Sequence, residues 1–265
     1  LAGTIAATRI SANTAAGFSI VQWTGDGNAS ARVGHGISKP DMIITKSLTD
    51  SNDWNVNHVG IPNQLLYLQS SNAAFSGGGT NGAFGYQSTN TSTTFGFTGG
   101  SSSVNNANKL NSNYIAYCFH SVDGYSKMGS YVGGGATDVP INLGFRPAFV
   151  MVKASSASGN WTMYDNKRQT GTAAYENYTI LLADDSYQEQ ADNTIRGIQF
   201  NSSGFILNQN YSLTNTSGVT YIFMAFAEEG LPYVTRNATN PFGDASELAL
   251  YKFEDNATDA EGNHS

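Results

Sequence analysis

Hydrophobic residues along this chain gather in short runs that are separated by turn-forming residues. Four runs are continuous and rich in β-branched or aromatic types, and they span residues 42–44, 114–119, 149–152 and 221–226. Such runs are too short for helices and predict central strands. The segment Trp54–His58 alternates apolar and polar residues and predicts a strand with one buried face. Clusters of Gly, Asn, Ser and Asp recur at about ten-residue spacing, which is typical of a sandwich or barrel.

The pattern also repeats along the chain with a constant offset of 107 in the numbering. The offset relates the pairs Gly17 and Gly124, Pro40 and Pro147, Lys46 and Lys153, Trp54 and Trp161, Tyr114 and Tyr221, and Phe119 and Phe226. Six landmarks that keep their order and one offset predict an internal duplication. We therefore expect an all-β protein with two tandem, jelly-roll-like β-sandwich units, each with about six to eight strands.

The repeat and the turn signals divide the chain into five segments. Residues 1–16 form an N-terminal linker or arm, 17–123 the first sandwich, and 124–230 the second. Residues 231–246 lose the alternation and contain Leu231-Pro232 and Asn240-Pro241, which predicts a linker. Residues 247–265 are too few for a domain and are interpreted as the start of a further one, which makes the chain part of a longer polypeptide.

The low number of charged residues and the negative net charge exclude two kinds of partner. Only 12% of the residues are charged, the net charge is −7, and the longest basic cluster is Lys167-Arg168. Nucleic-acid binding needs cations to neutralise phosphates, so no nucleic-acid partner is expected, and an anionic membrane surface is disfavoured for the same reason. No run of 18 apolar residues is present, and the start of the sequence lacks the features of a signal peptide, so no membrane insertion is expected.

Catalytic motifs for metal hydrolysis, nucleophilic serine chemistry, phosphate binding or redox thiols are missing from the sequence. The histidines His35, His58, His120 and His264 are not at metal-ligand spacing, and the first three have no histidine at the matching positions of the second copy. Cys118 is expected to be a small buried hydrophobe. We therefore expect no enzyme activity, no catalytic residues, no cofactor and no metal, and the ligand-binding residues stay unknown.

Three features have a second interpretation. The acidic pairs Asp50 and Asp53, Asp184 and Asp185, and Glu228 and Glu229 could serve glycoside hydrolysis, but they lie in predicted turns or strand ends. The oxygen-rich stretch 255–263 could bind calcium, although a solvated turn is favoured. Trp54 and Trp161 could stack on sugars, yet their matched positions favour core packing.

The strings Ala16–Lys46 with Trp54, and Gly144–Lys153 followed by Gly159–Asp165, resemble a domain of unknown function found in marine bacteriophage tail-fibre and other virion surface proteins. This resemblance covers about residues 17–230. The tail from Leu248 to Asn263 resembles the opening of a concanavalin A-like, laminin-G-type lectin domain. The resemblance implies a location on the virion surface, in a tail fibre or capsid appendage, and contact with a host.

The expected function is thus a non-enzymatic, extracellular virion structural protein that contributes to host attachment. Its expected partners are other copies of itself in a homotrimer, other virion proteins and a host surface glycan. Recognition is expected in variable loops such as 70–90 and in the further C-terminal domain, and not in the strands. The few apolar residues of 70–90 predict little contribution to folding. The alternative is a bacterial cell-surface adhesin or a carbohydrate-binding module of a larger secreted protein. A third hypothesis is a non-catalytic part of a glycan-degrading enzyme.

Overall fold

The structure is a computed structural model. It describes residues 2–76, 85, 87–97, 107–136, 139–168, 179–189, 197–208 and 210–228. Contacts divide the chain into one compact unit, Leu1–Pro232, and a second, Tyr233–Ser265. The expected linker 231–246 and the expected start of a lectin-like domain at 247–265 lie outside the described residues.

All regular elements of the described residues are strands, apart from the short 3-10 helix η1 (Gln87–Thr89). The first half of the unit holds β1 (Arg9–Asn13), β2 (Phe18–Thr24), β3 (Arg32–Gly34), β4 (Met42–Ser47), β5 (Asn55–His58), β6 (Leu66–Tyr67), β7 (Thr94–Gly96) and β8 (Asn113–Phe119). The second half holds β9 (Ser126–Val132), β10 (Val139–Asn142), β11 (Pro147–Ala154), β12 (Thr162–Asp165), β13 (Leu181–Leu182), β14 (Gly197–Asn201), β15 (Gly204–Asn208) and β16 (Thr220–Ala227). The all-β prediction is confirmed, and no helix of the described part has the length and apolar character needed to cross a membrane.

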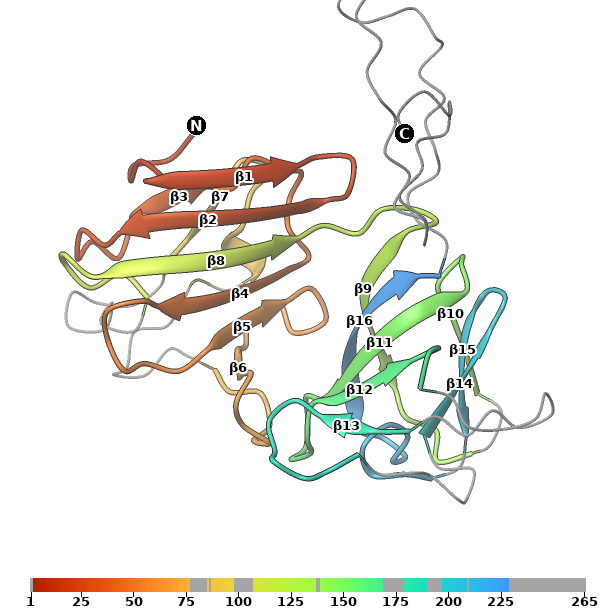
Figure 1. The fold of residues 1–265 in the computed structure, drawn as a ribbon. Helices are drawn as coiled ribbons and strands as arrows, with labels where there is room; N and C mark the ends of the chain where they lie inside the picture. The colour runs from red at the N-terminus through yellow and green to blue at the C-terminus, as the bar shows by residue number, and fades with distance from the viewer. Residues whose placement is uncertain are drawn as a thin grey trace, which may run out of the picture. The chain divides into compact units, whose positions relative to one another are not determined.

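Each half pairs a large antiparallel sheet with a small one (Figure 1). In the first half the large sheet has the order β1-β2-β8-β4-β5-β6, and β3 pairs with β7 in the small sheet. In the second half the large sheet has the order β13-β12-β11-β16-β9, and the small sheet has the order β10-β15-β14. The predicted central strands are confirmed, because β8, β4, β16 and β11 all lie inside their sheets.

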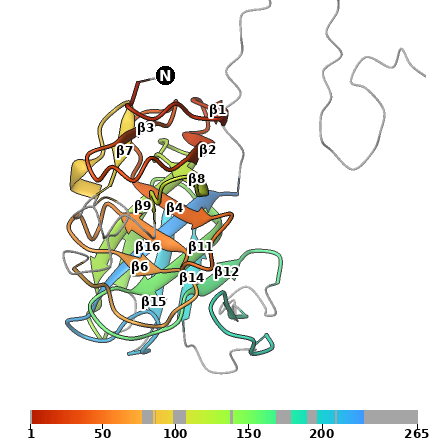
Figure 2. The same ribbon diagram turned by 90° about the vertical axis from the view of Figure 1, so that its left-hand side faces the viewer.

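A closed apolar core lies between the two sheets of each half, so both halves are sandwich-like (Figure 2). In the first core, Trp23 stacks on Tyr114 with ring centroids 5.3 Å apart and meets Phe95 edge-on at 5.4 Å. In the second core, Tyr131 stacks on Tyr221 at 5.2 Å. The stacked rings lie opposite each other on neighbouring strands of a large sheet, where side chains on one face come into contact. Phe95 reaches Trp23 from β7 in the small sheet.

The large sheets share strand order, and the pairings of β4 with β8 and β5 have the same register as those of β11 with β16 and β12. The order β2-β8-β4-β5-β6 corresponds to β9-β16-β11-β12-β13. Met42 lies opposite Phe119 and His58. Phe149, the counterpart of Met42 in the repeat, lies opposite Phe226 and Asp165, which are the counterparts of those two partners. Only the first half has an added edge strand among the described residues, β1, which pairs with β2.

A buried asparagine fixes the loop beside each core. Asn108 Oδ1 accepts from the Asp26 N–H at 3.3 Å, and its Nδ2 donates to Asn28 O at 3.0 Å. Asn215, its counterpart in the repeat, accepts from the Gly134 N–H at 3.0 Å and donates to Ala136 O at 2.7 Å. Both asparagines are fully buried, so each amide satisfies backbone groups that water does not reach.

Close packing beside these asparagines requires a glycine in each half. A Cβ at Gly25 would lie 2.2 Å from Lys109 O, and a Cβ at Gly133 would lie 2.3 Å from Thr216 O. No real side chain tolerates such contacts. The glycine turns seen in the sequence are therefore required by the loop that each asparagine holds.

A third apolar cluster joins the outer faces of the two large sheets. The first half contributes Met42, Ile44, Val56, Ile61 and Leu66, and the second half contributes Met128, Met151, Trp161 and Ile222. Both faces of the central strands of each large sheet are thus covered, one by the small sheet of its own half and the other by the opposite half. This explains why the central strands read as continuous apolar runs, since alternation is lost when both faces are buried.

Polar contacts cross the same interface. Lys153 Nζ on β11 donates to Asn72 O at 2.8 Å and Ser71 O at 3.3 Å, and Trp161 Nε1 donates to Tyr67 O at 3.0 Å. His58 Nε2 on β5 lies 3.1 Å from Phe223 O on β16. These contacts tie the two halves into one body.

Two predictions about this region are wrong. The strand Asn55–His58 does not have one exposed face, because all four of its residues are buried between the first core and the opposite half. The segment 70–90 does contribute to packing, because Ala74 joins the interface cluster and its N–H donates to Ser155 O. The glycine-rich stretch 77–82 itself lies outside the described residues.

The expected N-terminal arm is folded onto the first sandwich where it is described. Ile5 is buried in the first core, and its N–H donates to Arg32 O at 3.0 Å. Strand β1 follows with all five residues exposed, held by its pairing with β2. The expected boundary at 123–124 falls in the turn between β8 and β9.

Candidate functional site

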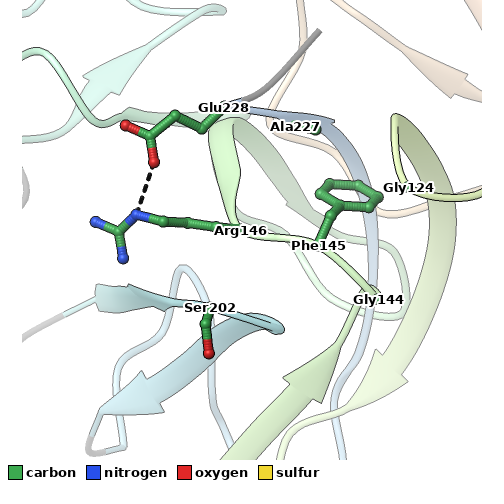
Figure 3. A pocket seen from close by; sticks show the side chains of 7 residues that line it. All are labelled: Gly124, Gly144, Phe145, Arg146, Ser202, Ala227 and Glu228. Atoms are coloured by element: carbon green, nitrogen blue, oxygen red, sulfur yellow. Dashed lines mark hydrogen bonds and ion pairs between the residues drawn. The ribbon is translucent and has the colours of Figure 1, made fainter. Parts of the chain in front are cut away.

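A hollow of about 420 Å³ lies at one end of the second sandwich (Figure 3). Four turns and strand ends meet there. Gly124 comes from the turn before β9, and Ser202 comes from the turn between β14 and β15. The connection from β10 to β11 contributes Gly144, Phe145 and Arg146, and the end of β16 contributes Ala227 and Glu228.

An ion pair stands at the rim of the hollow. Arg146 Nε donates to Glu228 Oε2 at 2.8 Å, and Asn166 Nδ2 donates to Glu228 Oε1 at 2.7 Å. The two backbones are also joined, because the Glu228 N–H donates to Arg146 O at 2.9 Å. The Arg146 and Glu228 side chains are 36% and 41% exposed, so the pair faces solvent while its geometry is fixed from several sides.

Two of the residues that line the hollow are glycines, and their missing side chains leave space in it. Gly124 and Gly144 have φ of +73° and +87°, a conformation that favours glycine. No heavy atom lies within 4 Å of the place where a Cβ would stand at either residue. Phe145 is buried to 7% exposure and anchors this connection in the second core.

The corresponding position in the first half carries a larger side chain. The N–H of Ala227, the last residue of β16, donates to Tyr125 O, and the N–H of His120, which is 107 positions earlier and directly follows β8, donates to Gly17 O. The His120 ring lies 2.8 Å from Lys39 O and 3.4 Å from Asp41 Oδ2. A Cβ at Gly17 would lie 2.3 Å from His120 O, so a side chain at Gly17 would clash with the backbone there.

The histidines that the sequence singled out have different hydrogen-bond partners in the structure. His35 is buried, with its ring 3.3 Å from Thr91 O, and burial lowers its pKa. His58 is buried between the halves, and desolvation lowers its pKa to about 4. His264 lies outside the described residues. In the described part of the chain no cluster of three His, Cys, Asp or Glu side chains could hold a metal ion.

Cys118 is buried in the first core, as expected. Desolvation raises the pKa of its thiol to about 12. A thiol held protonated is a poor nucleophile. It therefore acts as a small hydrophobe on β8.

The acidic pairs have different partners. Asp50 binds Lys109 at 2.6 Å, and Asp53 accepts from Gln69 Nε2 at 2.5 Å. Asp184 Oδ1 accepts the Trp161 N–H at 2.9 Å, and Asp185 accepts the Tyr187 N–H at 3.2 Å. Each of these carboxylates holds a turn or a strand end rather than a shared site. Glu229 and the stretch 255–263 lie outside the described residues.

Trp54 and Trp161 both join the cluster between the halves, so the core-packing interpretation is confirmed. Trp161 is 2% exposed, whereas Trp54 is half-buried and stacks on Tyr117 at 6.5 Å. A buried indole cannot stack on a sugar from solution. Trp161 in particular is excluded from ligand contact.

The sequence pattern did not indicate a binding or catalytic role for Lys153 or Arg146. Lys153 is fully buried, donates to three backbone carbonyls, and desolvation lowers its pKa to about 8. The Arg146 side chain lies at the rim of the hollow (Figure 3). The sequence did contain one signal for the hollow. Position 227 carries alanine, whereas the position 107 residues earlier carries His120.

The fold and site define an all-β, sandwich-like protein with a small hollow at one end of its second half. The family model for a domain of unknown function (DUF7483) matches residues 1–230, and the chain belongs to this family. Searches of the curated proteins and of the solved structures found no match.

Proposed function

We propose that this chain is a non-enzymatic structural protein of a phage virion, in a tail fibre or capsid surface appendage, where it contributes to host-surface attachment. The supporting observation is the repeated scaffold. Two halves share strand order, cross-strand register and a buried asparagine at corresponding positions, which favours an internal duplication. The halves pack face to face through an apolar cluster, which joins them into one body.

Loops on this scaffold supply the variable surfaces. Loops held by a rigid framework are where binding residues concentrate. In the proposed arrangement the chain lies outside the cell as a homotrimer, joined to other virion proteins, and a lectin-like segment follows from residue 247. The likeness of residues 248–263 to such lectins supports this last element.

The test is the composition of purified particles. Mass spectrometry of gradient-purified virions should find peptides of this chain at constant stoichiometry to the major capsid protein, and antibodies against it should label an appendage in electron micrographs. Antibody fragments should also slow adsorption to host cells. Absence of the chain from purified particles, with presence on bacterial envelopes, would reject the virion role in favour of a cell-surface adhesin.

A further inference from the structure

We propose that the hollow beside Arg146 and Glu228 binds the terminal unit of a neutral glycan, an inference that rests on the proposed attachment function. The hollow has a volume of about 420 Å³. Ligand pockets span roughly 300–1,000 Å³, so the volume suits a sugar unit or two. A long chain would extend from it into solvent.

Charge selects the class of ligand. Among the described residues that line the hollow, the cation Arg146 is paired with the anion Glu228 at 2.8 Å. The pair cancels its own charge, so neither an anionic nor a cationic ligand gains a net attraction. Each hydroxyl of a neutral sugar both donates and accepts. Adjacent hydroxyls can therefore accept from the guanidinium and donate to the carboxylate.

The geometry of the pair is fixed before binding. Asn166 holds the second oxygen of Glu228, and Arg146 Nη1 also lies 3.4 Å from Phe200 O on the small sheet. Polar groups that are already oriented lose little conformational entropy when a ligand binds. Because Gly124 and Gly144 have no side chains and face open space, a sugar ring can approach their backbone closely.

The scaffold itself does not need the hollow. In the first half the position of Ala227 is held by His120, whose ring contacts Lys39 O and Asp41. An alanine at 227 and open glycines at 124 and 144 are therefore a local difference between two otherwise matching frameworks.

The experiment uses the full chain on an array of neutral, sialylated and sulfated glycans, followed by titration of the best neutral hit observed by NMR. The wild-type chain should bind neutral glycans. Ala227→His, which installs the residue of the first half, and Gly144→Trp should each weaken binding at least about tenfold, which corresponds to the loss of one good contact. Arg146→Gln and Glu228→Gln should do the same. His120→Ala, a change of the same kind in the first half, is the matched control and should bind as the wild type does.

Each result decides the inference. Thermal unfolding identifies variants that have lost their fold, and the two rim variants keep the test open if Gly144→Trp does not fold. No binding to any neutral glycan, preference for sialylated or sulfated glycans, or full binding by both Ala227→His and the rim variants overturns it. Failure of the proposed function is a separate result, since it is read from the composition of particles and not from the array. A chain that is present in virions but binds no glycan retains the structural role and loses this site.

Discussion

Lowering the pH from 7 to 4 should weaken the contact between the two halves through His58. The ring is completely buried between β5 and the opposite sheet. Nε2 donates to Phe223 O at 3.1 Å, and Nδ1 accepts the Gly60 N–H at 3.0 Å. The partners thus select the neutral tautomer with its proton on Nε2. A second proton, on Nδ1, would face the Gly60 N–H and leave a buried charge.

The size of the effect follows from the pKa. Desolvation lowers the pKa of His58 from 6.5 to about 4, against the weaker opposing influence of the Phe223 carbonyl and Asp41. The unfolded chain therefore takes up a proton near pH 6.5, whereas the folded chain does so only near pH 4. Stability is fully present above pH 6.5 and is lost as the pH falls toward 4. At 1.36 kcal/mol per pKa unit, the loss is about 3 kcal/mol.

Urea unfolding of the wild type and of His58→Gln at pH 7 and pH 4 measures this contribution. Gln can still donate to Phe223 O but has no proton to gain. Other acid-sensitive groups, such as Asp50 and Asp165 with their lowered pKa values, are common to both proteins and cancel in the comparison. The wild type should lose about 3 kcal/mol more than the variant. Equal losses in the two proteins would refute the assignment of this acid sensitivity to His58.

Three further predictions concern stability and assembly. Asn108→Ala and Asn215→Ala should each cost roughly 1–3 kcal/mol, because each leaves buried backbone groups unpaired, and urea midpoints that match the wild type would contradict this. Trp161→Ala should cost roughly 3–5 kcal/mol, and the half-buried Trp54→Ala distinctly less, so a reversed order of their melting temperatures would contradict the interface described here. The full-length protein should have the mass of a homotrimer by light scattering, and a monodisperse monomer would count against the proposed fibre-like assembly.

The sequence predicted the strands well where one physical signal dominated. Runs such as Met42–Ile44 and Phe149–Val152 have the composition and length of buried central strands, and they form β4 and β11. It failed at Asn55–His58, because polar residues suggested an exposed face. Asn57 is instead held inside, where its Nδ2 donates to Gly85 O at 2.8 Å, and His58 is held by the opposite half. Both partners are remote in sequence, so no local pattern reveals them.

The hollow could not be predicted in the same way. Its walls come from connections that are far apart in the chain, and Arg146 and Glu228 are 82 residues apart. Glu228 was noticed as one member of an acidic pair, but its partners Arg146 and Asn166 become visible only when the strands place them together. The repeat offset makes Ala227 and His120 corresponding positions, and only the structure shows that this difference opens a space.

Differences between the halves mark the positions where their environments differ. His58 and Asp165 occupy the same place in the strand registers, next to Met42 and Phe149. His58 is buried against the opposite half, whereas Asp165 is partly exposed and binds Arg168 at 2.5 Å. The two matching sheets therefore bury this position in different ways.

The lysines near the ends of β4 and β11 also differ in their environments. Lys46 is partly exposed and donates to Ser47 O, whereas Lys153 is buried and reaches across to Ser71 and Asn72. Asn108 and Asn215, by contrast, are the same residue type, because each satisfies buried backbone groups of the loop beside its core. Ala227 and His120 differ although neither lies in the cluster between the halves. Packing between the halves therefore does not explain that difference, which is why the hollow, and not the interface, is the place to look for a ligand.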